Sequence, residues 1–314
     1  MMVIVSGSLA YDQIMDFPGK FSEHIMPEKL HILNLSFLVD TLRKGFGGTA
    51  GNIAYTLSLL GIKVSLLGTV GRDFEPYRQF LEKNKVSTRF VKELDRLQTS
   101  SAFGITDSSD NQIWGFYTGA DSESDKLSVD GIKEKIDFAV IAPHNPKAMI
   151  KFAKEYTNLK IPYLFDPGMQ LRWLGKDDIL AGFRGARVII GNDYEIEVMQ
   201  KKTGIANLHQ HYSDMVIITT LGERGSKLSW EREEIVVKSA KVKKAVDPAG
   251  AGDAYRAGFL AGYLRNLPLK TCGRIGSVSA AYTVEKYGTT THNFSLTEFN
   301  TRYRKNYPDS LPIE

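Results

Sequence analysis

The sequence predicts an α/β fold in which a mainly parallel sheet is covered by helices on both faces and carries a small lid of additional strands. Short apolar runs alternate with helix-like stretches along the chain, which is typical of a parallel sheet buried on both faces. Two stretches, 13–44 and 98–118, instead show period-two patches such as SAFGIT and QIWGFY. The 314 residues are enough for one large α/β domain with such an appendage.

The elements of the main sheet follow in order along the chain. The predicted buried strands are 2–6, 64–67, 138–142, 163–165, 188–190 and 215–219, and the predicted helices are 51–60, 74–84, 146–157, 176–183 and 193–203. Asp73 is the expected N-cap of the helix over FEPYRQFLEKN. We expect a core of residues 1–12, 45–97 and 119–314, and a lid of antiparallel strands from residues 13–44 and 98–118.

Composition and charge argue against several classes of protein. The net charge is only +4 and no block of five or six basic residues occurs, so nucleic acid is not an expected partner. The single cysteine, Cys272, allows no internal disulfide, which fits a reducing compartment. No stretch approaches about 18 consecutive apolar residues, and MMVIVSGS does not resemble a signal peptide. We therefore expect a cytoplasmic protein with a small-molecule substrate and no membrane partner.

The most informative stretch is DPAGAGDA (247–254), which stands directly before an apolar helical run. A Gly inside a helix costs about 1 kcal/mol relative to Ala. A helix N-terminus, however, exposes unpaired N–H groups and positive potential, and glycines let an anion approach them. The stretch is thus a candidate anion hole for a phosphoryl group, with Asp253 as a proton acceptor. On these residues alone, the anion hole and the alternative that Asp253 only balances the helix dipole are about equally well supported. Gly258 and Gly262 predict close packing of this helix.

A second glycine-rich turn, GFGGTAGN (45–52), also precedes a predicted helix. It matches the dinucleotide-binding fingerprint only loosely, because no clean strand precedes it. No G-x4-G-K-[ST] motif occurs in the sequence, which excludes a P-loop.

Together, the two glycine-rich elements resemble those of the ribokinase-like (PfkB) carbohydrate and nucleoside kinases. That family carries GG-x-x-x-N early and D-x-x-G-A-G-D late, which here are Gly47-Gly48…Asn52 and Asp247–Asp253. Between them, NDYE (192–195) resembles the N-x-x-E element and TLGERG (220–225) resembles the T-x-G-x-x-G nucleotide turn. The resemblance covers essentially the whole chain. It implies a ribokinase-like three-layer α/β/α fold with a β lid, and ATP as phosphoryl donor.

A narrower resemblance links the segment 6–40, with FPGKFSE and LSFLVD, to the bacterial, mycobacterial-type adenosine kinases. It implies phosphorylation of the adenosine 5′-hydroxyl to give AMP. One departure is the stretch MQLRW (169–173), which has one glutamine where those enzymes have a pair followed by arginine. Another purine nucleoside therefore stays open as substrate. The alternatives are a ribose or pentose kinase of the same family and, in a different class, a catalytically silent nucleoside-binding protein.

The resemblance implies a role for each matching residue. Asp253 would accept the hydroxyl proton, and the backbone of Gly250, Ala251 and Gly252 would hold the γ-phosphoryl group. The nucleoside would lie against three sets of residues: Asp12, Gly47, Gly48 and Asn52 at the ribose, Phe103 and Phe116 on the two faces of the base, and Ser8, Ser36 and Gln170 at the base edge. ATP would lie against Asn192, Thr220, Gly222, Gly225 and Ser277. Glu195 would bind Mg²⁺ through water, and Asp247 a monovalent cation such as K⁺.

Several of these residues have a purely structural alternative. Asn52 could cap a helix start, Asn192 could cap the helix that follows it with Glu195 as a surface carboxylate, and Asp247 could order the turn before Pro248. The lid aromatics could be packing residues. The lid strands have exposed edges that a second lid would cover, so we expect a homodimer through the lid.

Overall fold

The computed structural model describes residues 1–25, 32, 34–109 and 111–309 of the chain. Parts of the predicted lid stretches and of the segment 6–40 lie outside these described residues.

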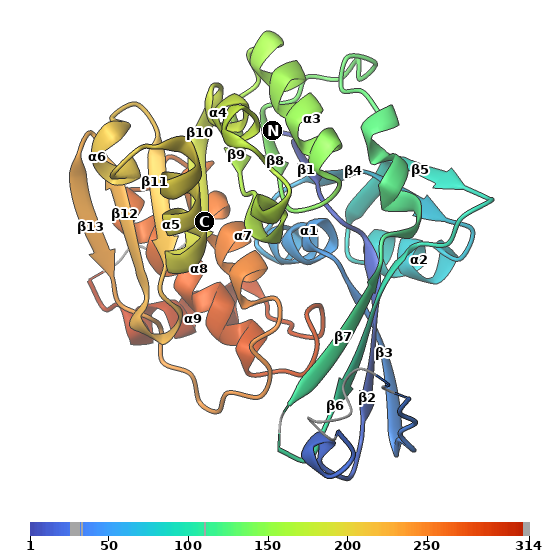
Figure 1. Ribbon diagram of the computed structural model, residues 1–314. Coiled ribbons are helices and arrows are strands. Elements are labelled where there is room, and N and C mark those ends of the chain that lie inside the picture. The colour runs from blue at the N-terminus through green and yellow to red at the C-terminus, as the bar shows by residue number, and fades with distance from the viewer. Residues whose placement is uncertain (26–31, 33, 110, 310–314) are drawn as a thin grey trace.

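The main sheet has nine strands among the described residues, in the spatial order β13-β12-β11-β10-β9-β8-β1-β4-β5 (Figure 1). They are β1 (Val3–Ser6), β4 (Val64–Gly71), β5 (Val86–Leu94), β8 (Phe138–Ile141), β9 (Tyr163–Phe165), β10 (Ala186–Asn192), β11 (Val216–Thr220), β12 (Ser226–Trp230) and β13 (Glu233–Val237). All neighbouring pairs are parallel except those that β12 and β13 make at one edge. The predicted, mainly parallel sheet is confirmed.

Helices cover both faces of this sheet. One core packs against α1 (Thr49–Leu59), α2 (Glu75–Lys83), α7 (Ala251–Tyr263), α8 (Leu269–Val284) and α9 (Leu296–Asn306), and the other against α3 (Pro146–Asn158), α4 (Lys176–Phe183), α5 (Asp193–Thr203) and α6 (Leu208–His211). Side chains of a strand alternate between the two cores: Val3 and Val5 lie in the first and Ile4 in the second. This is the predicted three-layer arrangement. Among the described residues, every helix is too short or too polar to span a membrane.

The predicted cap of α2 is wrong. The helix begins at Glu75 after Phe74, and no side chain caps it. The carboxylate of Asp73 instead accepts the backbone N–H of Thr99 at 2.8 Å, at the entry to the lid. The acidic residue before the helix therefore serves a contact between segments that are distant in sequence.

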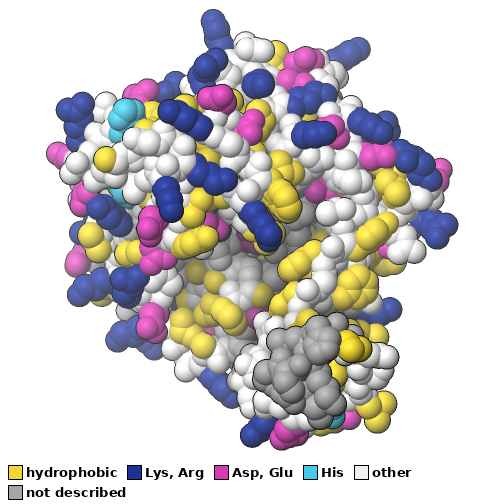
Figure 2. All heavy atoms as spheres, viewed as in Figure 1, with side chains coloured by type: hydrophobic (Ala, Val, Ile, Leu, Met, Phe, Trp, Pro, Cys, Tyr) yellow, Lys and Arg dark blue, Asp and Glu magenta, His cyan; other side chains and the backbone are white. Residues whose placement is uncertain are grey.

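The lid is a separate four-stranded sheet in the order β3-β2-β6-β7. Its strands are β2 (Ala10–Asp16), β3 (Thr41–Gly47), β6 (Ser100–Thr106) and β7 (Gln112–Tyr117). The outer pairs are antiparallel, but the central pair β2–β6 is parallel, so the expectation of a wholly antiparallel lid is wrong. Because β2 starts at Ala10, Asp12 lies on the lid sheet. A hollow separates this lid from the core (Figure 2).

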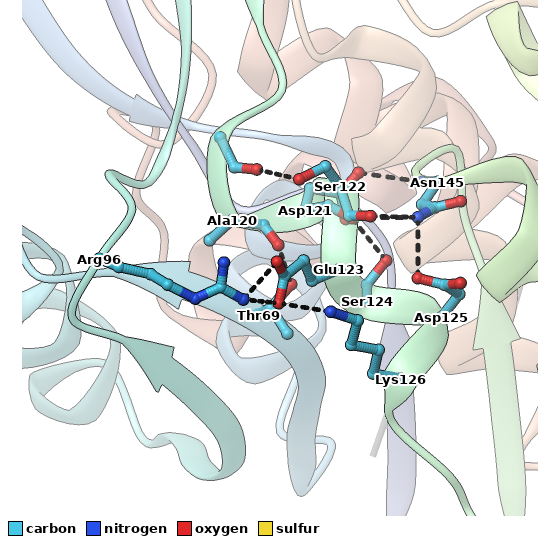
Figure 3. Close-up of polar contacts among 11 residues, drawn as sticks. Thr69, Arg96, Ala120, Asp121, Ser122, Glu123, Ser124, Asp125, Lys126 and Asn145 are labelled. Atoms are coloured by element: carbon cyan, nitrogen blue, oxygen red, sulfur yellow. Dashed lines mark hydrogen bonds and ion pairs between the residues drawn. The ribbon is translucent and has the colours of Figure 1, made fainter.

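The short helix η3 (Gly119–Lys126) anchors the lid where β7 returns to the core. The N–H of Ala120 donates to the carbonyl of Gln98 at 2.9 Å, which ties the two ends of the second lid segment together. The hydroxyl of Thr69 on β4 donates to the carbonyl of Ala120 at 2.7 Å, and the Asp121 carboxylate accepts the N–H of Asn145, the N-cap of α3, at 2.9 Å (Figure 3). The base of the lid is thus fixed to the main sheet and to α3.

Close packing of α7 against α8, which Gly258 and Gly262 predicted, is confirmed. A Cβ on Gly258 would lie 2.8 Å from the Cα of Gly276, and a Cβ on Gly262 would lie 3.1 Å from the Cα of Cys272. Both obstacles are backbone atoms, which cannot move aside as a side chain can.

We therefore expect Gly258→Val to lower the free energy of unfolding by about 3 kcal/mol, because the added atoms overpack the α7–α8 contact. Urea denaturation measures this change. The control is Gly131→Val, since a Cβ on Gly131 meets no atom within 4 Å. Equal losses in the two variants would contradict the explanation.

Candidate active site

The candidate site lies at the edge of the main sheet where the parallel strands end, the usual ligand-binding edge of open α/β sheets. Ser8 follows β1, Asp166 follows β9, Asn192 ends β10 and Thr220 ends β11. The first turn of α7 and the lid complete the surroundings. Motifs that are far apart in the sequence therefore lie close together, because the carboxyl ends of parallel strands meet at one edge of the sheet.

The first turn of α7 starts from Gly250, whose backbone is left-handed with φ of 74°. A Cβ at this position would lie 2.9 Å from the Cβ of Thr289, so conformation and space both require glycine. The N–H of Ala251 donates to the carbonyl of Pro248 at 3.2 Å, which closes the turn. Ala251 was predicted to offer this N–H to a phosphoryl group, but here the group has a partner within the chain. The next N–H groups of the helix lie in the first turn, where no intrahelical partner exists.

Asp247 orders this turn with both of its carboxylate oxygens. Oδ1 accepts the N–H of Ala249 and Oδ2 accepts the N–H of Gly288, each at 2.9 Å. This is the structural alternative that the sequence left open for Asp247.

Asp253 sits in the first turn of α7 with Asn52 as its partner. The side-chain amide of Asn52 donates to Oδ2 of Asp253 at 2.8 Å. Burial raises the pKa of Asp253, while Arg256 and the Asn52 hydrogen bond oppose the rise. Asn52 is buried inside α1, whose N-cap is Gly48, so Asn52 is not a helix cap. Its role toward the Asp253 carboxylate was not predicted.

Asp12 reaches the same region from the lid. Its carboxylate lies against Gly47 on the neighbouring strand, where any side chain would collide with it. Burial raises the pKa of Asp12 to about 6, and the charges of Asp247 and Asp253 add to the rise. Gly48 follows with φ of 84°, and a Cβ there would lie 2.7 Å from the N of Ala10. The structure thus brings the predicted ribose-binding residues beside Asp253.

A cavity of about 450 Å³ separates the inner face of the lid from the core. Its lid side includes Asp12, Ala102, Trp114 and Phe116, and its core side includes Asp247, Ala249 and residues 287–291. Asp12, Ala102 and Phe116 lie in one row across β2, β6 and β7, so their side chains share one face of the lid.

Phe103 lies on the opposite face of the lid. It stands in the row of Gln13 and Gly115, one residue out of phase with Phe116. Within one chain, Phe103 and Phe116 therefore cannot hold the two sides of one base, and this prediction is corrected. Trp114, which the sequence reasoning missed, stacks on Phe116 with ring centroids 5.9 Å apart. The period-two pattern of QIWGFY was the signal that places Trp114 and Phe116 on one face.

The three residues predicted at the base edge have different surroundings. Gln170 lies on η4 (Gly168–Arg172) and lines a second cavity, of about 1330 Å³, which Phe116 also lines. The hydroxyl of Ser8 accepts the N–H of Thr49 at 3.0 Å, at the start of α1. Ser36 is exposed in the segment before β3 and is not among the residues that line these cavities. The structure therefore brings Gln170, but not Ser36, near the lid aromatics.

A third cavity, of about 670 Å³, is lined by four of the five residues predicted to bind ATP, and Asn192 is not among its lining residues. Thr220, Gly222, Gly225 and Ser277 line it, together with Asp247, Ala251 and Gly252 from the α7 turn. The hydroxyl of Ser277 accepts the N–H of Ala240 at 2.7 Å, which fixes the far wall. Asp247 lines both this cavity and the one beneath the lid, so the two cavities adjoin at the turn that precedes α7.

Asn192 and Glu195 form a reciprocal cap at the start of α5. Oδ1 of Asn192 accepts the N–H of Glu195 and Oε2 of Glu195 accepts the N–H of Asn192, each at 2.8 Å. Asn192 therefore caps the helix, which is the structural alternative that the sequence left open for this residue. The negative charge of Glu195 nevertheless contributes to raising the pKa of both Asp253 and Asp166, so it acts on the site from the start of α5. The described residues contain no group of three or more His, Cys, Asp or Glu placed to hold a metal.

An ion pair that the sequence reasoning missed lies beneath the site. Nε of Arg256 on α7 contacts Oδ2 of Asp166, and both side chains are buried. Burial raises the pKa of Asp166 to about 7, although Arg256 opposes the rise. An arginine within the apolar run AYRAGFLAGYL was the available signal, because charged residues are rarely fully buried unless paired.

Comparison with known proteins gives consistent results. The model of the pfkB family carbohydrate kinases matches residues 10–295. A nucleoside kinase of Methanothermobacter thermautotrophicus is 33% identical over 268 residues, covering 82% of this chain and 84% of that protein. The structure of the Burkholderia thailandensis nucleoside kinase in complex with inosine has a TM-score of 0.88 at 32% identity, covering 99% of this chain and all of that one. The Methanocaldococcus jannaschii nucleoside kinase has a TM-score of 0.87 at 28% identity, covering 97% and 98% of the two chains.

Proposed function

Because the chain belongs to the pfkB family of carbohydrate kinases, we propose that it transfers the γ-phosphoryl group of ATP to the 5′-hydroxyl of a purine nucleoside. Adenosine is the leading substrate and AMP its product. The observation that carries the proposal is the position of Asp253 in the first turn of α7, directly after Ala251 and Gly252, which line the 670 Å³ cavity, and with Asn52 bonded to it. The related B. thailandensis nucleoside kinase was crystallised with inosine and with ADP-inosine, which supports a nucleoside acceptor and an adenine nucleotide donor.

In the proposed transfer, the Asp253 carboxylate acts on the hydroxyl and the first turn of α7 acts on the phosphoryl group. The 5′-oxygen bonds to the γ-phosphorus, the bond from that phosphorus to the β-phosphate oxygen breaks, and ADP leaves. Asp253 orients the hydroxyl and accepts its proton late, as the new bond develops. Asn52 holds Oδ2 of Asp253, which leaves Oδ1 to face the hydroxyl. The open N–H groups of the first turn, at Gly252 and Asp253, stabilise negative charge on the phosphoryl oxygens.

The lid supplies the contacts that would distinguish a nucleoside from a free sugar. The carboxylate of Asp12 can accept hydrogen bonds from two ribose hydroxyls. Phe116 and Trp114 offer a flat apolar surface for the base, and Phe116 is 68% exposed before any ligand binds. A ribose or pentose kinase would have no use for these rings. A silent binding protein would have no use for the Asn52–Asp253 pair.

The residues present fit a Mg²⁺ ion held mainly by phosphates and water. The described residues build no three-carboxylate cage, and the charge of Glu195 acts on Asp253 and Asp166. Mg²⁺ commonly uses one or two protein carboxylates plus substrate phosphates, and it would neutralise phosphate charge here. A K⁺ site at Asp247 stays a prediction, since the two hydrogen bonds of that carboxylate explain its position in the turn.

We also propose that two copies associate through the outer faces of their lids. Leu42, Met15, Ile105 and Ile113 form one apolar row across the four lid strands, on the face away from Asp12. Leu42 is 54% exposed and Ile113 is 44% exposed. A second lid would cover this row. A cytoplasmic location, as the composition suggests, completes the proposal.

The substrate is tested by measuring ADP release with adenosine, inosine, guanosine and ribose. We expect kcat/KM to be highest for a purine nucleoside, with adenosine first, and about 10²-fold or more lower for ribose, which cannot contact the aromatic rings. Phe116→Ala should lower kcat/KM for the nucleoside about tenfold, through loss of the stacking contact. Phe103→Ala is the matched control, because Phe103 faces the other side of the lid. Faster turnover of ribose than of any nucleoside would refute the proposed acceptor.

Asp253→Asn removes the proton acceptor while preserving the shape of the side chain. We expect kcat to fall about 10³-fold with little change in KM for either substrate, as is typical for loss of a general base. Steady-state kinetics with adenosine and ATP measure this. Asp130→Asn, at an exposed turn, is the control and should be unaffected. An Asp253→Asn enzyme with wild-type kcat would rule out the proposed proton acceptor.

The lid-to-lid contact is tested by light scattering. The wild-type protein should have twice the chain mass of 35.0 kDa, and Ile113→Glu should shift it toward a single chain because the variant buries a charge in the interface. Gln112→Glu adds the same charge on the same strand but on the inner face, so it should leave the mass unchanged. A wild-type mass of 35.0 kDa would contradict the proposal.

A further inference from the structure

Arg256 is a buried cation directly behind the first turn of α7. Only 9% of the residue is exposed. Long side chains on a helix point back toward its N-terminus, and here Nη1 of Arg256 would lie 2.5 Å from a Cβ on Gly252, four residues earlier. The guanidinium group therefore packs against the turn that the proposed function assigns to the phosphoryl group. Gly252 serves two purposes, since a side chain there would displace Arg256 as well as the anion.

One carboxylate contacts this guanidinium group, and two more act on it through their charges. Asp166, which is fully buried at the end of β9, forms the ion pair with Nε, and Asp253 and Glu195 also act on Arg256 through their charges. Burial opposes the charge on Arg256, but the three carboxylates outweigh it and raise the pKa of Arg256 above its usual value. The guanidinium group is thus a fixed positive charge held from three elements: β9, α5 and α7.

We infer that Arg256 is a positioning residue for phosphoryl transfer: held by Asp166, it places a fixed positive charge beneath the first turn of α7, which keeps the Asp253 carboxylate ready to accept a proton and favours an anion at that turn. The inference rests on the proposed kinase function. Without Arg256, the turn would carry the charges of Asp166, Asp253 and Glu195 when the phosphates of ATP arrive. The positive charge of the helix N-terminus alone corresponds to about half an elementary charge.

The competing explanation is that Arg256 and Asp166 only join α7 to β9. A purely structural ion pair loses its function equally when either partner is neutralised, because each change leaves one unpaired buried charge. A charge that acts on Asp253 depends on Arg256 itself, and Asp166 only holds it in place. The two explanations therefore differ in how Arg256→Gln compares with Asp166→Asn.

The experiment measures kcat and KM for adenosine and ATP in Arg256→Gln, Arg256→Lys and Asp166→Asn. We expect Arg256→Gln to lower kcat about 10²-fold, the size of effect seen when one stabilising group of a transition state is removed. KM for adenosine should change less than about threefold, because Arg256 does not line the nucleoside cavity. Arg256→Lys, which keeps the charge, and Asp166→Asn, which keeps the arginine, should each retain at least about tenfold more activity than Arg256→Gln.

The pH dependence of kcat/KM provides a second readout that a structural role would not change. Asp253 must be ionised to accept a proton, so activity rises with pH through its pKa, and loss of the neighbouring cation moves this rise to higher pH. The groups whose charges or hydrogen bonds act between Asp253 and its surroundings are Asn52 from α1, Asp12 from the lid, Tyr77 from α2, Asp166 after β9, Glu195 from α5 and Arg256 from α7 itself. Only the last is changed in Arg256→Gln. An unshifted profile would overturn the inference.

Folding is controlled in two ways. Arg78→Gln removes a cation paired with Glu93 on the surface, away from these cavities, and should keep wild-type kcat. The double variant Asp166→Asn/Arg256→Met removes both buried charges, so it should unfold at a temperature closer to that of the wild type than Arg256→Gln does, yet retain its low kcat. Equal loss of kcat in Arg256→Gln and Asp166→Asn, or recovery of kcat in the double variant, would overturn the inference. Failure of the wild-type protein to phosphorylate any nucleoside would instead refute the proposed function.

Discussion

Under the proposed function, the whole site depends on one constraint: the N-terminus of α7 must receive an anion in a region already crowded with carboxylates. Four carboxylates lie close to the first turn of α7. Two come from distant segments, Asp12 and Asp166, and two come from the DPAGAGD stretch itself, Asp247 and Asp253. Burial and repulsion between like charges both favour the protonated, neutral form of a carboxylate unless a neighbouring group stabilises its charge. The amide of Asn52, which is bonded to Asp253, and the guanidinium of Arg256 oppose protonation of Asp253 and Asp166 here.

The same constraint explains the glycines. Gly47 gives space to the Asp12 carboxylate, Gly250 turns the chain against Thr289, and Gly252 gives space to Arg256. Each glycine lowers the stability of the helix or strand that contains it. The space that these glycines leave for charged side chains, and for the anion of the proposed function, explains why they are concentrated around one turn. Close contact between α7 and α8 then holds the turn rigidly, which a site that works through fixed charges requires.

Much of the fold was predictable because it depends on local periodicity. Apolar runs placed six of the parallel strands within a few residues but missed β5, and glycines of the predicted motifs line the cavity proposed for the nucleotide. The errors have one physical origin, which is that a side chain's partner can come from anywhere in the chain. Asp73 looked like a helix cap but bonds to Thr99, and Phe103 looked equivalent to Phe116 until strand pairing put it one residue out of phase. The Asp166–Arg256 pair joins residues 90 positions apart, and no local pattern encodes such a pairing.

The position of the lid and the geometry of the catalytic turn are mechanically connected. The carbonyl of Phe46, at the end of lid strand β3, accepts the hydroxyls of Thr289 and Thr290 at 3.1 Å each. Thr289 in turn packs against Gly250, and the neighbouring Gly288 donates to Asp247. One residue after Phe46, Gly47 contacts Asp12, and the chain then enters α1, which carries Asn52. A movement of β3 would therefore displace the segment 288–290 and the start of α1 together. Under the proposed function, closure of the lid over a nucleoside would also move the residues that hold the Asp253 turn in place.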